Sequence, residues 1–159
     1  MKSMRQRAAD GLKVGDTFRV SRVFTQEEVS LFAKISGDYN PIHFDEAFAK
    51  TRNFVAPICH GLLSASLATE IGGQIGWLAS KMHFEFKKPV YIGERIQCDW
   101  VITSIDERGR ASAAVVIINE SGDVVITADV GGVISGDEQR ALLQEMIATG
   151  DPTNALRGS

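Results

Sequence analysis

A segment near the middle of the chain, Leu62 to Ile71, limits the folds open to this sequence. It is apolar or small on nearly every side, and Glu70 is its only charge. A helix without a polar face belongs inside a protein, enclosed by other elements. Four small residues that let a sheet approach the backbone closely are Gly61, Ser64, Ala65 and Ala68. The segment therefore predicts a buried central helix, which Gly72 and Gly73 weaken or end.

The hydrophobic period changes at Lys81 to the spacing of two that is typical of β-strands. The stretches "MHFEF" and "RIQCDWVI" place alternate apolar residues on one face, and "AAVVIIN" and "VVITADVGGVI" are nearly continuous apolar runs. Turn-forming residues separate them at Pro89 and Gly93, at 106–109 and at 119–123. Because the connections are short, we expect four antiparallel strands. A sheet curled around one helix leaves an edge and a face uncovered, so we also expect self-association.

A strand and a helix are expected before the central segment. Residues 17–24, "TFRVSRVF", alternate well enough for a strand. Thr25 and Glu28 form the pattern of a capping box at a helix start, and Gly37 is a natural helix end. We expect residues 1–15 to be a flexible lead-in, residues 16–136 to be one folded domain, and residues 137–159 to be a short helix with a polar tail.

Charge and cysteine content argue against several classes of function. The formal net charge of −3 at pH 7 gives no electrostatic reason to bind nucleic acid or an anionic membrane surface. No stretch approaches the roughly 20 apolar residues that a membrane span needs. Cys59 and Cys98 form no pattern typical of a disulfide framework or a zinc site. We therefore expect a cytoplasmic protein with neither a membrane nor a nucleic-acid partner.

The stretch "SGDYNPIHFD", Ser36 to Asp45, combines turn-forming residues with two side chains that can transfer protons. Asp38 alone is typical of a turn after a helix end, and His43 alone is more often a packed side chain than a catalyst. Pro41 stiffens the segment between them and can hold both side chains toward one point. A carboxylate and an imidazole that share one water form an acid/base pair. Both interpretations, a turn and a catalytic pair, are open at this point.

Three segments together resemble the MaoC-like dehydratases, a family that includes (R)-specific enoyl-CoA hydratases. The family's hydratase 2 motif is matched by Phe32-x-x-Ile35-Ser36-Gly37-Asp38-x-Asn40-Pro41-Ile42-His43. Residues 54–67 resemble the family's central-helix segment, and residues 84–94 resemble the pair of strands that follows it. The resemblance covers roughly residues 12–135. It implies the α+β hot-dog fold, a curved antiparallel sheet around one long helix, which agrees with the elements expected above.

The resemblance also implies roles for individual residues. Asp38 and His43 hold and activate a water, and the backbone N–H of Gly61 polarises the thioester carbonyl. In the family a serine further along the helix assists the aspartate, and Thr69 stands at the matching position. Asn40, within the motif, is a further candidate for substrate contact, and Tyr39 and Trp77 are candidates for lining the acyl pocket on their bulk rather than on the resemblance. His60, directly before Gly61, either orients the loop or has a helix-capping or packing role. No metal and no cofactor is implied, and the expected assembly is a homodimer or a multiple of one.

The activity implied is the reversible syn addition of water to a trans-2-enoyl thioester, which gives a (3R)-3-hydroxyacyl thioester. The carrier is either coenzyme A or an acyl carrier protein, and either Asp38 or His43 is the base. One alternative is a hot-dog thioesterase, which needs a carboxylate on the central helix, where Glu70 is the only one available. Another is a non-catalytic acyl-binding module, because a fold does not fix an activity. The complete Asp-x-Asn-x-x-His motif favours the hydratase.

Overall fold

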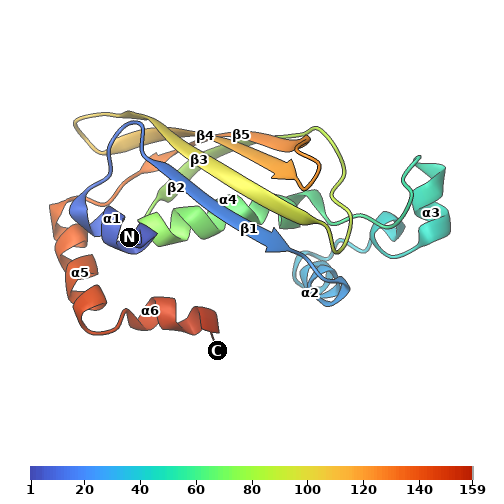
Figure 1. Ribbon diagram of the computed structural model, residues 1–159, viewed down its shortest axis with the longest axis horizontal. Helices are drawn as coiled ribbons and strands as arrows, with labels where there is room; N and C mark the ends of the chain where they lie inside the picture. The colour runs from blue at the N-terminus through green and yellow to red at the C-terminus, as the bar shows by residue number, and fades with distance from the viewer. Residues whose placement is uncertain (159) are drawn as a thin grey trace.

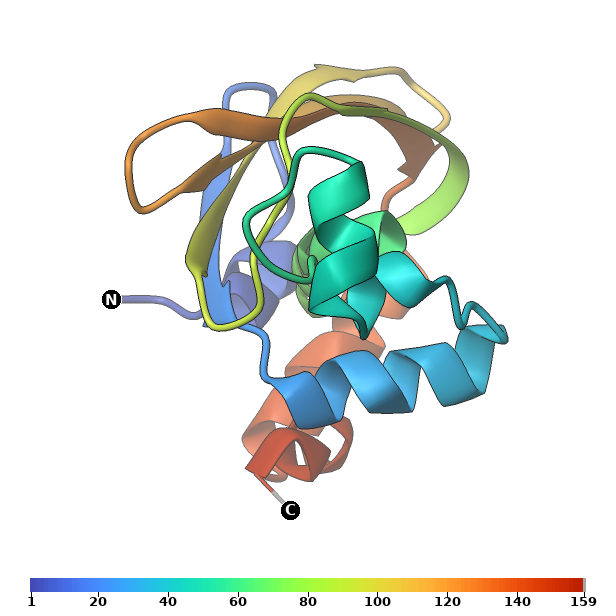
Figure 2. The ribbon, with the colours of Figure 1, turned by 90° about the vertical axis from the view of Figure 1, so that its right-hand side faces the viewer.

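A five-stranded antiparallel sheet curves around one long helix (Figures 1 and 2). The computed structural model describes residues 1–158. The strands are β1 (Thr17–Val23), β2 (Leu78–Phe86), β3 (Arg95–Ile105), β4 (Arg110–Asn119) and β5 (Val124–Val133). Their order across the sheet is β1-β3-β4-β5-β2, and every pairing is antiparallel. The expected α+β architecture is confirmed.

The central helix, α4 (Gly61–Ile75), packs one face under the sheet. Its buried residues are Leu63, Ser64, Ala65, Leu67, Ala68, Ile71, Gly72 and Ile75. The opposite side, which includes Leu62 and Thr69, is exposed, so α4 is enclosed on one side rather than all round. The expectation that Gly72 and Gly73 end this helix is wrong, because it continues for one more turn to Gly76, which has a φ of 67°. Glycine costs about 1 kcal/mol in a helix interior, and the burial of Ile75 offsets that cost.

Alternation along the strands builds the other half of the core. In β3 the side chains of Ile96, Cys98, Trp100 and Ile102 are buried, as their spacing predicts. The β3 and β4 strands are joined by a tight turn, and so are β4 and β5, with a left-handed glycine at Gly109 and at Gly122. In contrast, β2 is an edge strand that is exposed along nearly its whole length.

The remaining helices lie at the two ends of α4. The helices α2 (Gln26–Ser36) and α3 (Glu46–Thr51), with the 3-10 turn η1 (Pro41–His43), lie at one end (Figure 1). The helices α1 (Met4–Asp10), α5 (Asp137–Ala148) and α6 (Pro152–Ala155) lie at the other, and the 3-10 turn η2 (Leu156–Gly158) follows α6. None of the helices in residues 1–158 is both long and apolar enough to cross a bilayer.

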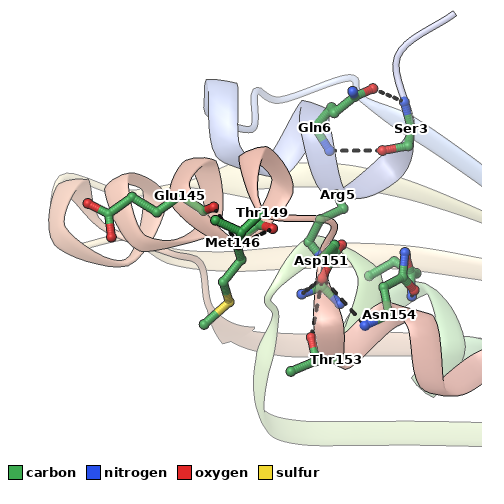
Figure 3. A network of polar contacts seen from close by, with 10 residues as sticks. Ser3, Arg5, Gln6, Glu145, Met146, Thr149, Asp151, Thr153 and Asn154 are labelled. Carbon is green, nitrogen blue, oxygen red and sulfur yellow. Dashed lines mark hydrogen bonds and ion pairs between the residues drawn. The ribbon is translucent and has the colours of Figure 1, made fainter.

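The two chain ends are more ordered than expected. Residues 4–10 form α1 instead of a flexible lead-in, and Ala8 and Ala9 are buried where α1 packs on α5 and α4. Figure 3 shows the capping box that starts α1, in which Ser3 and Gln6 exchange hydrogen bonds of 2.8 and 3.1 Å. The tail expected to be loose contains α6. Asp151 caps that helix and lies 3.8 Å from the guanidinium of Arg5.

The helix α2 is bounded as the sequence predicts. Thr25 Oγ1 accepts from the Glu28 N–H at 3.2 Å, and Glu28 Oε2 accepts from the Thr25 N–H at 2.9 Å. Gly37 ends the helix with a left-handed φ of 75°. The chain then turns back toward the start of α4, and this reversal brings the Asp38–His43 motif against the central helix (Figure 2).

Candidate active site

A run of side-chain to backbone hydrogen bonds holds the Asp38–His43 motif in a compact turn. The Asp38 N–H donates to Ser36 Oγ at 3.2 Å, and Asp38 Oδ1 accepts from the Asn40 N–H at 3.1 Å. Asn40 Oδ1 in turn accepts from the Ile42 N–H at 3.2 Å, which caps η1. The turn interpretation is therefore correct. It leaves Oδ2 of Asp38 free to face His43.

Asp38 and His43 face each other at a distance too long for a direct hydrogen bond. Oδ2 of Asp38 lies 3.7 Å from Nε2 of His43, and the Asp38 side chain is half exposed while His43 is buried. The other ring nitrogen, Nδ1, lies 2.7 Å from the carbonyl oxygen of Ile58. A carbonyl only accepts, so Nδ1 carries the hydrogen and the lone pair of the neutral ring is on Nε2.

The protonation state of His43 follows from its surroundings. Burial lowers the pKa of His43 below its usual value, and the neighbouring His60 acts in the same direction. Together they outweigh the Ile58 carbonyl and the Asp38 charge, which favour the charged ring. At neutral pH the imidazole is therefore neutral. Its Nε2 and the Asp38 carboxylate are both hydrogen-bond acceptors. A water between them can donate one hydrogen to each, and its oxygen lone pairs then remain free.

His60 holds both members of the pair. Its ring is stacked on that of His43, with 3.8 Å between ring centres and 28° between planes. Its Nε2 lies 2.9 Å from the carbonyl oxygen of Asp38, to which it donates. Phe32 packs on His60 at 4.9 Å between ring centres. Of the roles left open for His60, packing agrees with these ring contacts, whereas its side chain makes no hydrogen bond that caps α4. Its hydrogen bond to the Asp38 carbonyl also ties it to the motif.

The three polar side chains of this cluster do not fit a common metal ion. Atoms of Asp38, His43 and His60 lie within 4.8 Å of one another, which satisfies proximity. The lone pairs of an imidazole lie in its ring plane, however, and two rings stacked almost in parallel cannot both point at one ion.

A cavity of about 330 Å³ joins His43 to the first turn of α4. Six of its lining residues are His43, Gly61, Ser64, Phe86, Val90 and Ile126. The helix begins at Gly61, and within residues 1–158 the N–H of Gly61 has no hydrogen-bond acceptor. A Cβ at this position would lie 2.8 Å from Cε1 of Phe86, so only glycine fits unless Phe86 moves. A helix N-terminus presents free N–H groups and the positive end of the helix dipole to this cavity.

The structure does not bring Thr69 or Trp77 to this cavity. Thr69 lies on the exposed side of α4, where its Oγ1 donates to the Ser66 carbonyl at 2.6 Å. It lines a different hollow, together with Arg22 and Glu70. Trp77 is buried beyond the C-terminal end of α4, edge-on to Trp100 with 5.1 Å between ring centres. Trp77 is thus used in the core, and within one chain neither residue contacts the Asp38–His43 pair.

Tyr39 and Asn40 lie beside the pair without lining the cavity. Tyr39 is exposed and stacks on Phe44 at 6.2 Å between ring centres. Asn40 is occupied as the cap of η1. Sequence reasoning noted Ser64 only for its small size and missed that it lines the cavity. Its position three residues after Gly61 was the available signal, because residues three apart lie on the same helix face.

Comparison with known proteins places the chain in a family. The sequence profile described as "MaoC like domain" matches residues 12–124. The chain belongs to the MaoC-like family. This MaoC-like chain is 34% identical over 127 residues to the (R)-specific enoyl-CoA hydratase of Aeromonas caviae, a match that covers 77% of the chain and 95% of that protein.

One further relative and one solved structure extend the similarity. The chain is 30% identical over 131 residues to the mitochondrial 3-hydroxyacyl-acyl-carrier-protein dehydratase FERN of Solanum lycopersicum, covering 77% of this chain and 78% of that protein. The solved structure titled as the (R)-hydratase from A. caviae involved in PHA biosynthesis superposes with a TM-score of 0.74 at 33% identity. That match covers 79% of this chain and 98% of the other. The expected family and its hot-dog fold are confirmed.

Proposed function

We propose that this MaoC-like protein is a hydro-lyase that reversibly adds water to trans-2-enoyl thioesters, giving (3R)-3-hydroxyacyl thioesters. One observation carries the proposal. Asp38 Oδ2 and His43 Nε2 lie 3.7 Å apart, and His43 lines the same cavity as Gly61, whose N–H has no acceptor among the described residues. A water activator and an electrophile activator therefore meet at one site. The names of the relatives describe the same class of reaction.

The addition needs a stronger nucleophile and a stronger electrophile than free water and a free enoyl thioester provide. In the proposed mechanism, water between Asp38 and His43 gives one proton to the pair as its oxygen bonds to C3 of the substrate. The π electrons of the C2=C3 bond move toward the thioester carbonyl, whose oxygen becomes negative. The N–H of Gly61 and the dipole of α4 stabilise this oxyanion. The proton then passes from the pair to C2, so atoms and charges balance.

Stereochemistry follows from the position of the pair. Oxygen and proton both come from the side of the substrate that faces Asp38 and His43, so the addition is syn. The relatives from Aeromonas caviae carry the (R) designation in their names, and we extend it to this chain. Because the two acceptor groups share one water, we describe them as a unit and assign the base to the pair.

Each relative supports a different carrier for the acyl group. The name of the Aeromonas caviae protein specifies a coenzyme A thioester, and the name of the Solanum lycopersicum protein specifies an acyl-carrier-protein thioester. We therefore propose an acyl thioester substrate and leave both carriers to the assay. We also propose that the protein acts in the cytoplasm as a homodimer or a multiple of one. The exposed edge strand β2 supports self-association, since it has unpaired backbone groups and exposed Leu78, Met82 and Phe86.

A thioesterase is less well supported by the position of its expected carboxylate. Glu70 lines the hollow that contains Thr69, away from the cavity of His43 and Gly61. It is also ion-paired with Arg157. The non-catalytic alternative does not account for a buried neutral histidine opposite a carboxylate, which is an arrangement suited to proton transfer.

Incubation with crotonyl-CoA separates the three functions. Loss of absorbance from the conjugated thioester without release of free thiol supports hydration. Release of thiol identifies a thioesterase, and binding without turnover identifies an acyl-binding module. The same assay with the crotonyl thioester of an acyl carrier protein compares the two carriers. If the protein hydrates neither thioester, the proposed function is wrong.

A further inference from the structure

Ser64 has a buried hydroxyl that no residue in the described part of the chain pairs with. The residue is 1% exposed, and its Oγ has no hydrogen-bond partner within residues 1–158. Other helical serines behave differently, because each donates to a carbonyl of the preceding turn. Their bonds are Ser30 to Gln26 at 3.0 Å, Ser36 to Phe32 at 2.7 Å and Ser66 to Leu63 at 2.6 Å. A buried hydroxyl without a partner is unfavourable, which points to a ligand that Ser64 is placed to meet.

Ser64 and Gly61 line the same cavity. They lie three positions apart on α4, so they share one face of the helix. Helical side chains lean toward the N-terminus of their helix, which directs Ser64 toward the level of Gly61. Much of the remaining lining is apolar, with Phe86, Val90 and Ile126 among it. The first turn of α4 thus offers two donors to one region of the cavity.

A role for Ser64 as nucleophile does not fit the geometry. A serine nucleophile needs a base within hydrogen-bond distance, and Ser64 has no such contact in the described residues. The Nδ1 atom of His43 is bonded to the Ile58 carbonyl, and its Nε2 atom faces Asp38. Donation of its hydrogen to a substrate oxygen needs no such base.

We propose that the Ser64 hydroxyl is a second hydrogen-bond donor to the thioester carbonyl oxygen, beside the Gly61 N–H. This inference rests on the proposed function. Two donors stabilise the negative oxygen better than one, and they fix the plane of the thioester relative to the water held by Asp38 and His43. The gain is largest in the transition state, where the charge on the oxygen is greatest.

The test is Ser64→Ala, with Ser66→Ala as the matched control on the same helix. In Ser64→Ala we expect kcat for crotonyl-CoA hydration to fall about 10- to 100-fold with KM nearly unchanged, the pattern of an interaction made in the transition state. Its Tm should stay the same or rise, because the variant loses an unpaired buried hydroxyl. A purely structural role would instead lower Tm. Ser66→Ala should keep the parent kcat, since Ser66 Oγ already donates to Leu63.

Three results would overturn the inference. The first is a Ser64→Ala kcat within about threefold of the parent, a range in which no transition-state bond has been lost. The second is an increase in KM alone, which would make Ser64 a contact for the acyl chain. The third is a parent protein that hydrates no enoyl thioester, a result that removes the proposed function as well. In the first two cases the parent is active, so the proposed function stands while the donor role fails.

Discussion

The imidazole rings of His43 and His60 are stacked, with 3.8 Å between their centres and 28° between their planes. His60 also donates to the Asp38 carbonyl and is the residue directly before Gly61. One buried ring therefore links the two groups proposed to hold the water with the helix end proposed to bind the carbonyl. This arrangement keeps His43 in a poorly solvated position, which sets its acid–base behaviour.

The acid side of the pH profile should report the lowered pKa of His43. Burial disfavours the charged ring, so His43 remains an acceptor to a lower pH than an exposed histidine, whose pKa is about 6.5. We expect kcat/KM to be maintained as pH falls through about 6.5 and to decline only below it. The measurement is kcat/KM against pH, with NMR titration of His43. A His43 pKa above that of an exposed histidine would contradict this account.

The same shift has a consequence for stability. The unfolded chain takes up a proton on His43 below about pH 6.5, whereas the folded chain does so only at lower pH. The unfolded state therefore binds more protons in this window, and the free energy of unfolding decreases as pH falls through it. Chemical denaturation of the parent and His43→Gln at pH 7 and 5.5 measures this difference. An equal pH dependence in the two proteins would remove His43 as its source.

Replacement of either member of the pair should abolish most of the activity without unfolding the protein. Asp38→Asn and His43→Gln keep the approximate shape but remove the charge or the proton acceptor, and each should lower kcat about 10²- to 10⁴-fold. Asp45→Asn is the control. This substitution removes the same charge close to the site, but the Asp45 side chain only caps α3. Circular dichroism verifies the fold. Activity within about tenfold of the parent in either site variant would refute the catalytic interpretation of the motif.

Two variants at Gly61 distinguish the contribution of its N–H to activity from the contribution of its missing side chain. Both Gly61→Ala and Gly61→Pro add a Cβ that meets Phe86, but only proline removes the N–H. Proline is tolerated at a helix start, and the ψ of 137° at His60 is compatible with a following proline. We expect kcat in Gly61→Pro to be about 10²- to 10³-fold below that in Gly61→Ala. Equal kcat values in the two would show that the oxyanion donor lies elsewhere.

Self-association should depend on the edge strand β2. Light scattering of the parent should report a dimer or a multiple of one, and Met82→Lys should weaken it because a lysine on an edge strand disfavours pairing. Val116→Lys on β4 is a matched control, since Met82 is 36% exposed and Val116 37% exposed. A parent that is monomeric at micromolar concentration and still active would refute the proposed dimer. An equal loss of self-association in both variants would show that β2 does not form the interface.

Hydration in D₂O tests whether one face of the substrate receives both groups. A water held between Asp38 and His43 delivers oxygen to C3 and deuterium to C2 from the same side, so the product should be the syn adduct. NMR of the product measures the relative placement of the two. A (3S)-specific hydroxyacyl-CoA dehydrogenase should detect no product. An anti adduct would refute the shared water, whereas a syn (3S) product would refute only the facial preference.

Structural features that are set by residues close together in the chain could be predicted from the sequence. The capping box of Thr25 and Glu28, the helix end at Gly37 and the alternation along β3 all agree with the structure, because each signal lies within a few residues. The order of polar groups in the Asp38–His43 motif was likewise visible, together with its turn. In α1 a local signal was present, the Ser3–Gln6 capping box, but the burial of Ala8 and Ala9 depends on packing with α5, more than 120 residues away.

The chemistry of the candidate site depended on contacts between distant segments. The Ile58 carbonyl fixes the hydrogen of His43 on Nδ1, and His60, 22 residues from Asp38, orients the motif. Thr69 and Ser64 lie on one helix only five residues apart, yet the helix turns Thr69 toward solvent and Ser64 toward the cavity. The sequence by itself determined which reactive side chains are present and which local elements carry them. Only the tertiary structure decided their burial, tautomer and direction, because these follow from packing against residues remote in the chain.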